Sequence, residues 1–192
     1  MWLRRLTACI SIIALLIAFS SATSAAWIAG KARLAQHLLD VAWQTSQQLN
    51  RPVKPWNWAD IRTIGRLQVP SRDESLVVLN DASGEAMAFG PGLVAGDPAR
   101  AATSSIAIGG HRDTHLAFLQ HQKPGDLFLL ETLEGKIHRY RYLDSQIVDT
   151  RLHSLSISTQ NPGLVLITCY PFDARQTGGP LRLVVRAAYV PS

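Results

Sequence analysis

Charged residues are missing from one long stretch near the N-terminus, residues 6–28. The stretch reaches the roughly 20 apolar residues that span a bilayer, and Arg4 and Arg5 before it favour a cytoplasmic N-terminus. It also lacks an A-x-A cleavage triplet, although its small and polar residues 20–26 leave a cleavable signal peptide as the alternative. We therefore predict that residues 1–30 are an uncleaved signal-anchor, that residues 6–28 contact the membrane, and that the remaining chain lies outside the cytoplasm.

Cysteine is also scarce, with two among 192 residues. Cys9 lies inside the apolar run, where we interpret it as a small membrane-embedded hydrophobic residue, so Cys169 is the only thiol of the remaining chain. It has no disulfide partner there. Because export compartments oxidise or pair most cysteines, an unpaired thiol in an exported domain indicates a chemical use, and we predict nucleophilic catalysis.

Clusters of positive charge are lacking as well, although the chain carries a formal net charge of +5. The basic residues are scattered between Arg33 and Arg186, and no aromatic residues are interleaved with them in a nucleic-acid-binding motif. This pattern argues against a nucleic-acid partner. The excess of positive charge instead suggests affinity for acidic surfaces such as anionic lipid or cell-wall material.

Residues 31–60 are predicted to form a helical stalk and a connector. Residues 31–49 place leucine and valine near one face of a short amphipathic helix. Two prolines within residues 51–60 end this helix, since proline lacks a backbone donor and forces the preceding residue to extend. Trp56 and Trp58 alternate across the extended connector, and we expect both to clamp onto the following domain.

Long helical patterns are absent from residue 61 onward, and residues 61–192 are predicted to form one mainly β domain. Short apolar runs recur there between turns rich in glycine, proline, asparagine and aspartate. The runs are residues 64–69, 76–79, 104–108, 126–131, 137–148, 164–168 and 181–190. Strands at this spacing favour a sandwich or a closed barrel over a parallel α/β sheet, and only residues 115–121 allow a short helix.

The thiol of Cys169 stands at the end of the buried run 164–168. Thiol catalysis requires a base or an imidazolium within hydrogen-bond reach, and His111 also follows a buried run, after two glycines that let the backbone bend. Arg182, at the start of the last run, is the preferred cation for stabilising an oxyanion, ahead of Arg175 in the preceding loop. Strand alternation alone does not decide which face of this last run points inward.

Three segments resemble the sortase family, the membrane-anchored cysteine transpeptidases that attach proteins to the bacterial cell surface. Residues 107–114 (AIGGHRDT) are similar to the family's histidine motif in its class D form, residues 165–172 (VLITCYPF) to its TLxTC motif, and residues 180–185 (PLRLVV) to its arginine strand. Val165 departs from the usual threonine, a change that affects packing more than chemistry. The Trp-rich connector and the basic, apolar N-terminus most resemble the Gram-negative branch.

The resemblance implies a closed, mostly antiparallel barrel of eight strands and a role for each motif residue. It implies that Cys169 is the nucleophile, that His111 is the general acid and base, and that Arg182 stabilises the oxyanion. The residues implied to support these three or to contact substrate are Gly110, Thr168 and Tyr170.

The implied reaction cleaves an LPxTG-like C-terminal sorting signal of an exported protein through a thioacyl-enzyme and transfers that protein to an amine acceptor. No cofactor or metal is predicted, and a zinc site at His111, Asp113 and His115 is disfavoured because no cysteine or glutamate completes the ligand set. The alternatives are another envelope Cys–His hydrolase or transpeptidase and a non-catalytic, membrane-tethered β-domain that binds envelope ligands. We expect a single-pass protein of the bacterial inner membrane with its catalytic domain on the periplasmic side.

Overall fold

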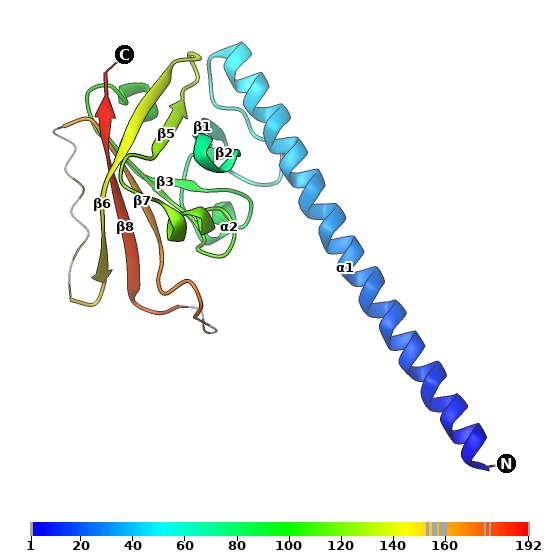
Figure 1. The fold of residues 1–192 in the computed structure, drawn as a ribbon. Coiled ribbons are helices and arrows are strands. Elements are labelled where there is room, and N and C mark those ends of the chain that lie inside the picture. Colours follow the sequence, from blue (N-terminus) through cyan, green and yellow to red (C-terminus); the bar gives the residue numbers. More distant parts are fainter. Residues whose placement is uncertain are drawn as a thin grey trace. The chain divides into compact units, whose positions relative to one another are not determined.

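The computed structural model describes residues 2–152, 154, 157, 161–174, 176 and 178–191, without the side chains of residues 3–11 and 25 (Figure 1). Arg175, the less favoured candidate for the oxyanion cation, lies outside the described residues. The chain divides into two compact units, Met1–His37 and Leu38–Ser192. The predicted stalk and connector, residues 31–60, are thus divided between the two units.

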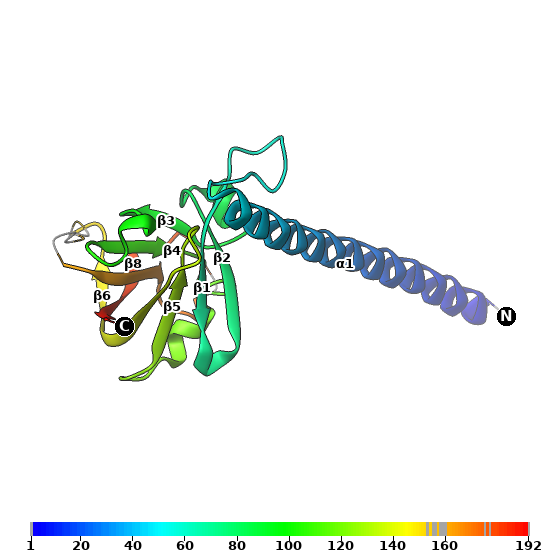
Figure 2. The same ribbon diagram turned by 90° about the horizontal axis from the view of Figure 1, so that it is seen from above.

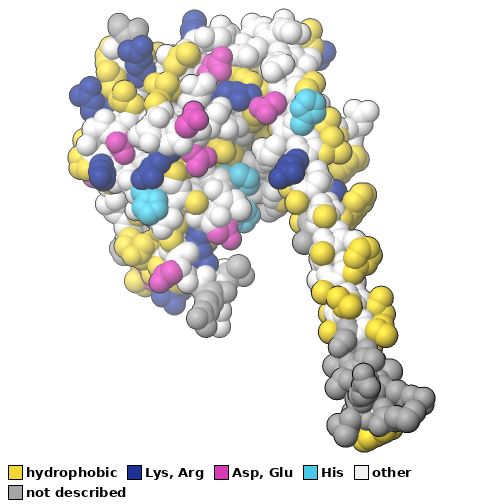
Figure 3. All heavy atoms as spheres, turned by 45° about the vertical axis from the view of Figure 1, so that its right-hand side comes forward, with side chains coloured by type: hydrophobic (Ala, Val, Ile, Leu, Met, Phe, Trp, Pro, Cys, Tyr) yellow, Lys and Arg dark blue, Asp and Glu magenta, His cyan; other side chains and the backbone are white. Residues whose placement is uncertain are grey.

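Helix α1 (Trp2–Leu49) runs without a break through both segments for which helical structure was predicted. Its part from Ile12 onward is long and apolar enough to cross a membrane. Leu15, Phe19 and Trp27 are among its large exposed apolar side chains, and Figure 3 shows hydrophobic side chains along the described part of the helix. The first unit therefore carries apolar surface of the kind that a bilayer covers.

The second unit is built around a closed barrel of eight strands, which confirms the predicted fold (Figures 1 and 2). The strands are β1 (Thr63–Val69), β2 (Glu74–Leu79), β3 (Gly92–Ala95), β4 (Ser105–Gly109), β5 (Leu127–Glu131), β6 (Ile137–Asp149), β7 (Gly163–Cys169) and β8 (Leu181–Val190). Their order around the barrel is β1-β2-β3-β4-β7-β8-β6-β5. Because β7 lies between β4 and β8, the end of β4 becomes a neighbour of two strands that come much later in the sequence.

Two details of the β domain differ from the prediction. Strand β3 was not among the seven apolar runs, because it has only four residues and depends on pairing with β4. The described part of the domain contains the short helical segments η1 (Pro70–Arg72), α2 (Gly84–Met87), η2 (Pro98–Arg100) and η3 (Ala117–His121). The expectation of one short helix was therefore wrong. Local capping explains two of them, since the side chains of Ser83 and Asp97 accept hydrogen bonds from backbone N–H groups of α2 and η2.

Alternate residues of β7 and β8 face the barrel interior. Leu166 of β7 and Val185 of β8 belong to the main buried core. The intervening residues lie on the outer face of the sheet, where Ile167 and Val184 are nevertheless buried: Val165, Ile167 and Cys169 on β7, and Arg182, Val184 and Arg186 on β8. The structure thus shows which face of β8 points inward, a question that strand alternation left open. It puts Cys169 and Arg182 on the same outer surface.

A second, smaller core joins the C-terminal end of α1 to the barrel. Trp43 is 1% exposed and shares this core with Val77 and Leu79, two residues of β2. Beneath the helix, the hydroxyls of Ser46 and Thr63 form a buried hydrogen bond of 2.7 Å. The last turns of α1 are therefore part of the folded domain.

The connector after α1 holds its two tryptophans differently from the prediction. Residues 55–59 bend rather than extend, so Trp56 and Trp58 stack on each other with ring centroids 5.5 Å apart. Trp56 packs edge-on against Phe89 at 4.7 Å and is partly buried, whereas Trp58 is 72% exposed. Trp58 also meets the ring of Phe89 edge-on, with centroids 6.4 Å apart, so both tryptophans contact the domain, but only Trp56 is partly buried there.

Candidate active site

Cys169 and Arg182 are brought together by the pairing of β7 with β8. They lie directly opposite each other in the antiparallel register, and such partners hold their Cβ atoms about 5 Å apart on one face of the sheet. Both side chains are partly exposed, and Cys169 is a free thiol. The pairing sets a thiol beside a permanent cation.

The guanidinium of Arg182 is held at the start of β8 by backbone carbonyls. Its Nη1 donates to the carbonyl of Gly179 at 2.6 Å and to that of Leu181 at 2.9 Å. Within the described part of the chain, these are the hydrogen bonds that the guanidinium makes, and both use Nη1. The Nε and Nη2 groups are therefore available to an anion that forms beside the thiol.

The end of β4 places His111 next to the end of β7. Gly110 donates its N–H to the carbonyl of Ile167 at 3.1 Å, and its own carbonyl accepts a 2.8 Å hydrogen bond from Oγ1 of Thr168. Thr168 is 2% exposed, so this hydrogen bond is shielded from water. His111 follows as an exposed residue at the start of the next loop. Two hydrogen bonds thus fix the backbone that carries the imidazole to the strand that carries Cys169.

Gly110 and Tyr170 occupy positions that constrain the two loops of the site. A Cβ atom at Gly110 would lie 2.9 Å from Cγ of Leu116, so the loop after β4 packs back onto a position with no room for a side chain. Tyr170 donates its N–H to the carbonyl of Leu181 at 3.0 Å, which continues the pairing of the strands one residue beyond Cys169. The structure brings all six predicted site residues to adjoining ends of β4, β7 and β8.

Arg112 joins the same two loops, a role that the sequence analysis did not assign. Its Nη2 donates to the carbonyl of Ala174 at 2.8 Å and to that of Gln176 at 3.1 Å. The loop after β4 is thereby tied to the loop after β7. The place of Arg112 beside His111 in the motif was the available signal, but a bond to distant loop carbonyls cannot be read from spacing.

His115 lies close to His111, with ring centroids 6.4 Å apart. Burial lowers the pKa of His115 below its ordinary value of 6.5, and repulsion by His111 lowers it further, while Asp113 opposes both effects. Among the residues that the structure describes, no group of three or more His, Cys, Asp or Glu side chains is placed to hold a metal ion.

The lowered pKa of His115 predicts a loss of stability in acid. At a pH between the lowered pKa of the folded state and the unfolded pKa of 6.5, His115 binds more protons in the unfolded chain than in the folded one. The neutral imidazole therefore contributes its full stabilisation above pH 6.5, and this stabilisation is lost as the pH falls through the folded pKa. We expect His115→Gln to make the fall in Tm between pH 8 and pH 5 shallower than in the unchanged chain. Thermal unfolding of both proteins at pH 8 and pH 5 measures this. The difference in Tm between the two proteins at pH 8 gives the effect of altered packing alone. Equal falls in both proteins would contradict the assignment.

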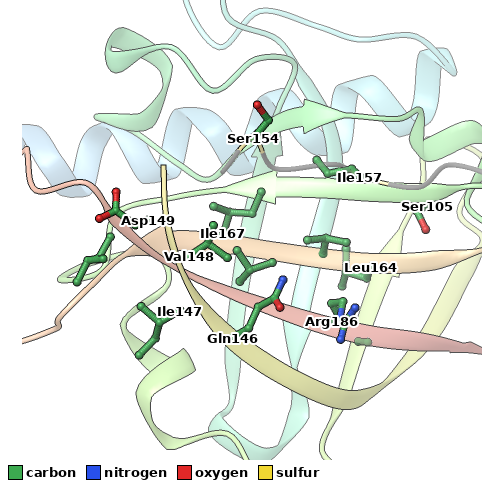
Figure 4. Close-up of a pocket in the computed structure, with 14 residues that line it drawn as sticks. Ser105, Gln146, Ile147, Val148, Asp149, Ser154, Ile157, Leu164, Ile167 and Arg186 are labelled. Atoms are coloured by element: carbon green, nitrogen blue, oxygen red, sulfur yellow. The ribbon is translucent and has the colours of Figure 1, made fainter. Parts of the chain in front are cut away.

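Two cavities are lined by residues that lie close to Cys169 along the chain. The larger, of about 750 Å³, runs along the outer faces of β7 and β8 and includes Ile167 and Val184, each two residues from a member of the Cys169–Arg182 pair. Figure 4 shows Gln146, Ile167 and Arg186 along this cavity. The smaller, of about 400 Å³, is lined by residues of the two loops, including Tyr170 and Arg112. The chain on one side of Cys169 thus lines a groove along the sheet, and the chain on its other side lines a second recess between the loops.

A family model described as Sortase domain matches residues 67–190, which include nearly all of the barrel. The chain therefore belongs to the sortase family, whose members are cysteine transpeptidases. This match confirms the predicted family. In a comparison with curated protein sequences, nothing matches the chain.

Solved sortase structures share the fold. Sortase A from Corynebacterium diphtheriae is 19% identical, with 82% of this chain and 85% of that chain covered and a TM-score of 0.59. Sortase A of Listeria monocytogenes is 20% identical, with 67% and 88% covered and a TM-score of 0.58. The catalytic domain of SrtD from B. anthracis is 25% identical, with 67% and 88% covered and a TM-score of 0.55. The last of these gives weak support to the predicted relation to class D.

Proposed function

We propose that this chain is a membrane-anchored transpeptidase that cleaves an LPxTG-like sorting signal near the C-terminus of an exported protein. Cys169 is its nucleophile, and an amine at the cell surface is its acceptor. The observation that carries the proposal is the register of β7 and β8, which sets Cys169 opposite Arg182, next to the row of Ile167 and Val184 that lines the larger groove. The hydrogen bonds of Gly110 to β7 hold His111 at the same edge.

The proposed reaction has two acyl-transfer steps. The thiolate of Cys169 attacks the carbonyl carbon of the scissile peptide bond, and Nε or Nη2 of Arg182 stabilises the negative charge on the carbonyl oxygen. The imidazolium of His111 protonates the departing amine, which leaves a thioester on Cys169. The acceptor amine then attacks that thioester and gives a proton to the neutral His111, and the thiolate of Cys169 is released, which restores the starting thiolate and imidazolium.

The two cavities suit the two halves of the substrate. The acyl half must stay bound through the thioester stage, and the elongated groove of about 750 Å³ offers it the longer contact surface. The leaving half departs and the acceptor amine arrives, and the recess beside Tyr170 and Arg112 is open to both. In this arrangement Arg112 is a positioning residue, because it ties together the two loops that form the recess.

The membrane anchor of the proposed enzyme is α1. The uncharged residues 6–28 would cross the bilayer with Arg4 and Arg5 on the cytoplasmic side, which leaves the barrel on the periplasmic side of an inner membrane. This placement supports an exported protein as the substrate, because the sorting signal and the thiol then meet on the same side.

Intact-protein mass spectrometry of the full chain in detergent micelles tests the proposal. The chain is incubated with LPxTG-like peptides, with and without an added primary amine. We expect an adduct on Cys169 equal in mass to the N-terminal peptide fragment, and its discharge by the amine. Failure to form any adduct, by a thiol that alkylates readily, would favour another substrate class. A thiol that does not alkylate would favour the non-catalytic binding domain.

Arg182 and Thr168 are expected to differ in their effects on the reaction. Arg182→Ala removes the cation and should lower kcat/KM by about 100-fold. Thr168→Ala removes only the hydrogen bond to the Gly110 carbonyl and should lower kcat/KM by about tenfold. Steady-state kinetics with one peptide measures both, and thermal unfolding checks that each variant is folded. The opposite ranking would move the oxyanion role away from Arg182.

A further inference from the structure

The larger groove is lined by residues of β7 and β8 from the rows that follow the Cys169–Arg182 pair. Across β7 and β8, Ile167 lies opposite Val184, and Val165 lies opposite Arg186. The neighbouring strand β6 extends these two rows, because Gln146 lies opposite Val184 and Asp144 lies opposite Arg186. Moving away from the thiol, the floor is first apolar at Ile167 and Val184 and then charged at Arg186.

The charged row lies at a distance that corresponds to a definite position in a bound peptide. Arg186 is four residues along β8 from Arg182, which at about 3.4 Å per residue puts its row roughly 14 Å from that of Cys169. An extended peptide advances about 3.3 to 3.6 Å per residue. A peptide that lies along the groove with the carbonyl of its first residue before the scissile bond at Cys169 therefore has about its fifth residue before that bond over Arg186.

The side chains at that position form a neutral, hydrogen-bonded pair. Nε and Nη2 of Arg186 donate to Oδ1 and Oδ2 of Asp144, each at 2.7 Å. Both side chains remain about half exposed, at 52% and 43%. An aliphatic side chain placed over this pair would exclude water from the guanidinium and the carboxylate. It would offer no hydrogen bonds in place of those that the two groups make to water. A charged side chain would find no net opposite charge, since the pair is neutral.

We propose that Arg186, Asp144 and Gln146 form a subsite that selects a carboxamide side chain, glutamine or asparagine, at about the fifth residue before the scissile bond. A carboxamide oxygen accepts from the guanidinium of Arg186, and its NH₂ group donates to the carboxylate of Asp144 or to the side chain of Gln146. Both ionic groups then keep hydrogen-bond partners when the peptide excludes water. The inference rests on the proposed function and adds to its substrate one residue, directly before the four LPxT-like residues.

Four peptides that differ only at this position test the proposal. They carry glutamine, leucine, glutamate or lysine there, and the readout is the rate at which the full chain in detergent micelles forms the acyl adduct on Cys169. We expect the glutamine peptide to react about tenfold faster than the leucine peptide, and faster than either charged peptide.

The double variant Asp144→Leu/Arg186→Leu should reverse the preference, so that the leucine peptide reacts faster. The matched control is Asp60→Leu/Arg62→Leu, which removes another surface ion pair, of 3.2 Å, outside the groove. This control should keep the glutamine preference. If the first variant does not fold, Asp144→Asn/Arg186→Gln replaces it, and we expect the loss of the two charge-assisted hydrogen bonds to lower the preference about threefold.

The outcomes separate this inference from the proposed function. Faster reaction of the leucine peptide with the unchanged chain, or a preference that is the same in the groove variants, overturns the subsite and leaves the transpeptidase intact. An absence of adducts from all four peptides, with a thiol that still alkylates, overturns both together.

Discussion

Replacement of Cys169 by alanine is expected to abolish acyl-adduct formation and to lower turnover at least about a thousandfold. The thiol faces outward at the end of β7 and contributes little to the core, so the free energy of unfolding should change by less than about 1 kcal/mol. Intact-protein mass spectrometry and a peptide-cleavage assay measure the first effect. Urea unfolding measures the second.

The other cysteine provides the matched control for this experiment. Cys9→Ala removes the only other thiol and lies in the apolar N-terminal run, so full activity is expected. Full activity in Cys169→Ala would refute the covalent mechanism. Loss of activity together with loss of folding would mean that Cys169 has a structural role instead.

Replacement of Trp43 by alanine is expected to destabilise the second unit by about 4 kcal/mol, roughly a thousandfold in the unfolding equilibrium. Trp43 is 1% exposed in the core that α1 shares with β2, and the variant leaves a cavity there. Urea unfolding of the full chain in micelles, followed by near-UV circular dichroism, measures the change.

Trp58→Ala is the control for this variant, because the same side chain is 72% exposed in the same unit. It should cost less than about 1 kcal/mol. Equal destabilisation by the two variants would mean that the end of α1 does not contribute to the folded domain. For the same reason, a soluble version of the enzyme should begin at Leu38, since a chain that starts at Arg51 lacks Leu39 and Trp43.

The strands that carry the site were predictable because their patterns are local. The run at residues 181–190 coincides with β8, and the run at residues 137–148 falls one residue short of the end of β6. Alternating or continuous apolar residues indicate burial without knowledge of the partner strand. The missed strand, β3, has four residues and is defined by its pairing with β4.

The packing of α1 on the barrel was not predictable in the same way. The helix carries apolar side chains on much of its surface along its length, so periodicity alone does not identify the residues that touch β2. The stacking of Trp56 on Trp58 was missed because it depends on a bend in the connector that the two prolines do not specify.

By itself, the sequence determined the family, the closed β-barrel class and the identity of the three residues proposed for catalysis, because short motifs and apolar patterns encode them. Only the tertiary structure decided that Cys169 faces Arg182, that Arg112 reaches the loop after β7, and that Arg186 pairs with Asp144. Each of these contacts depends on register or loop closure between distant segments. A shift of one residue in the β7–β8 pairing, for example, would turn either Cys169 or Arg182 to the opposite face of the sheet. Local sequence patterns do not specify that register.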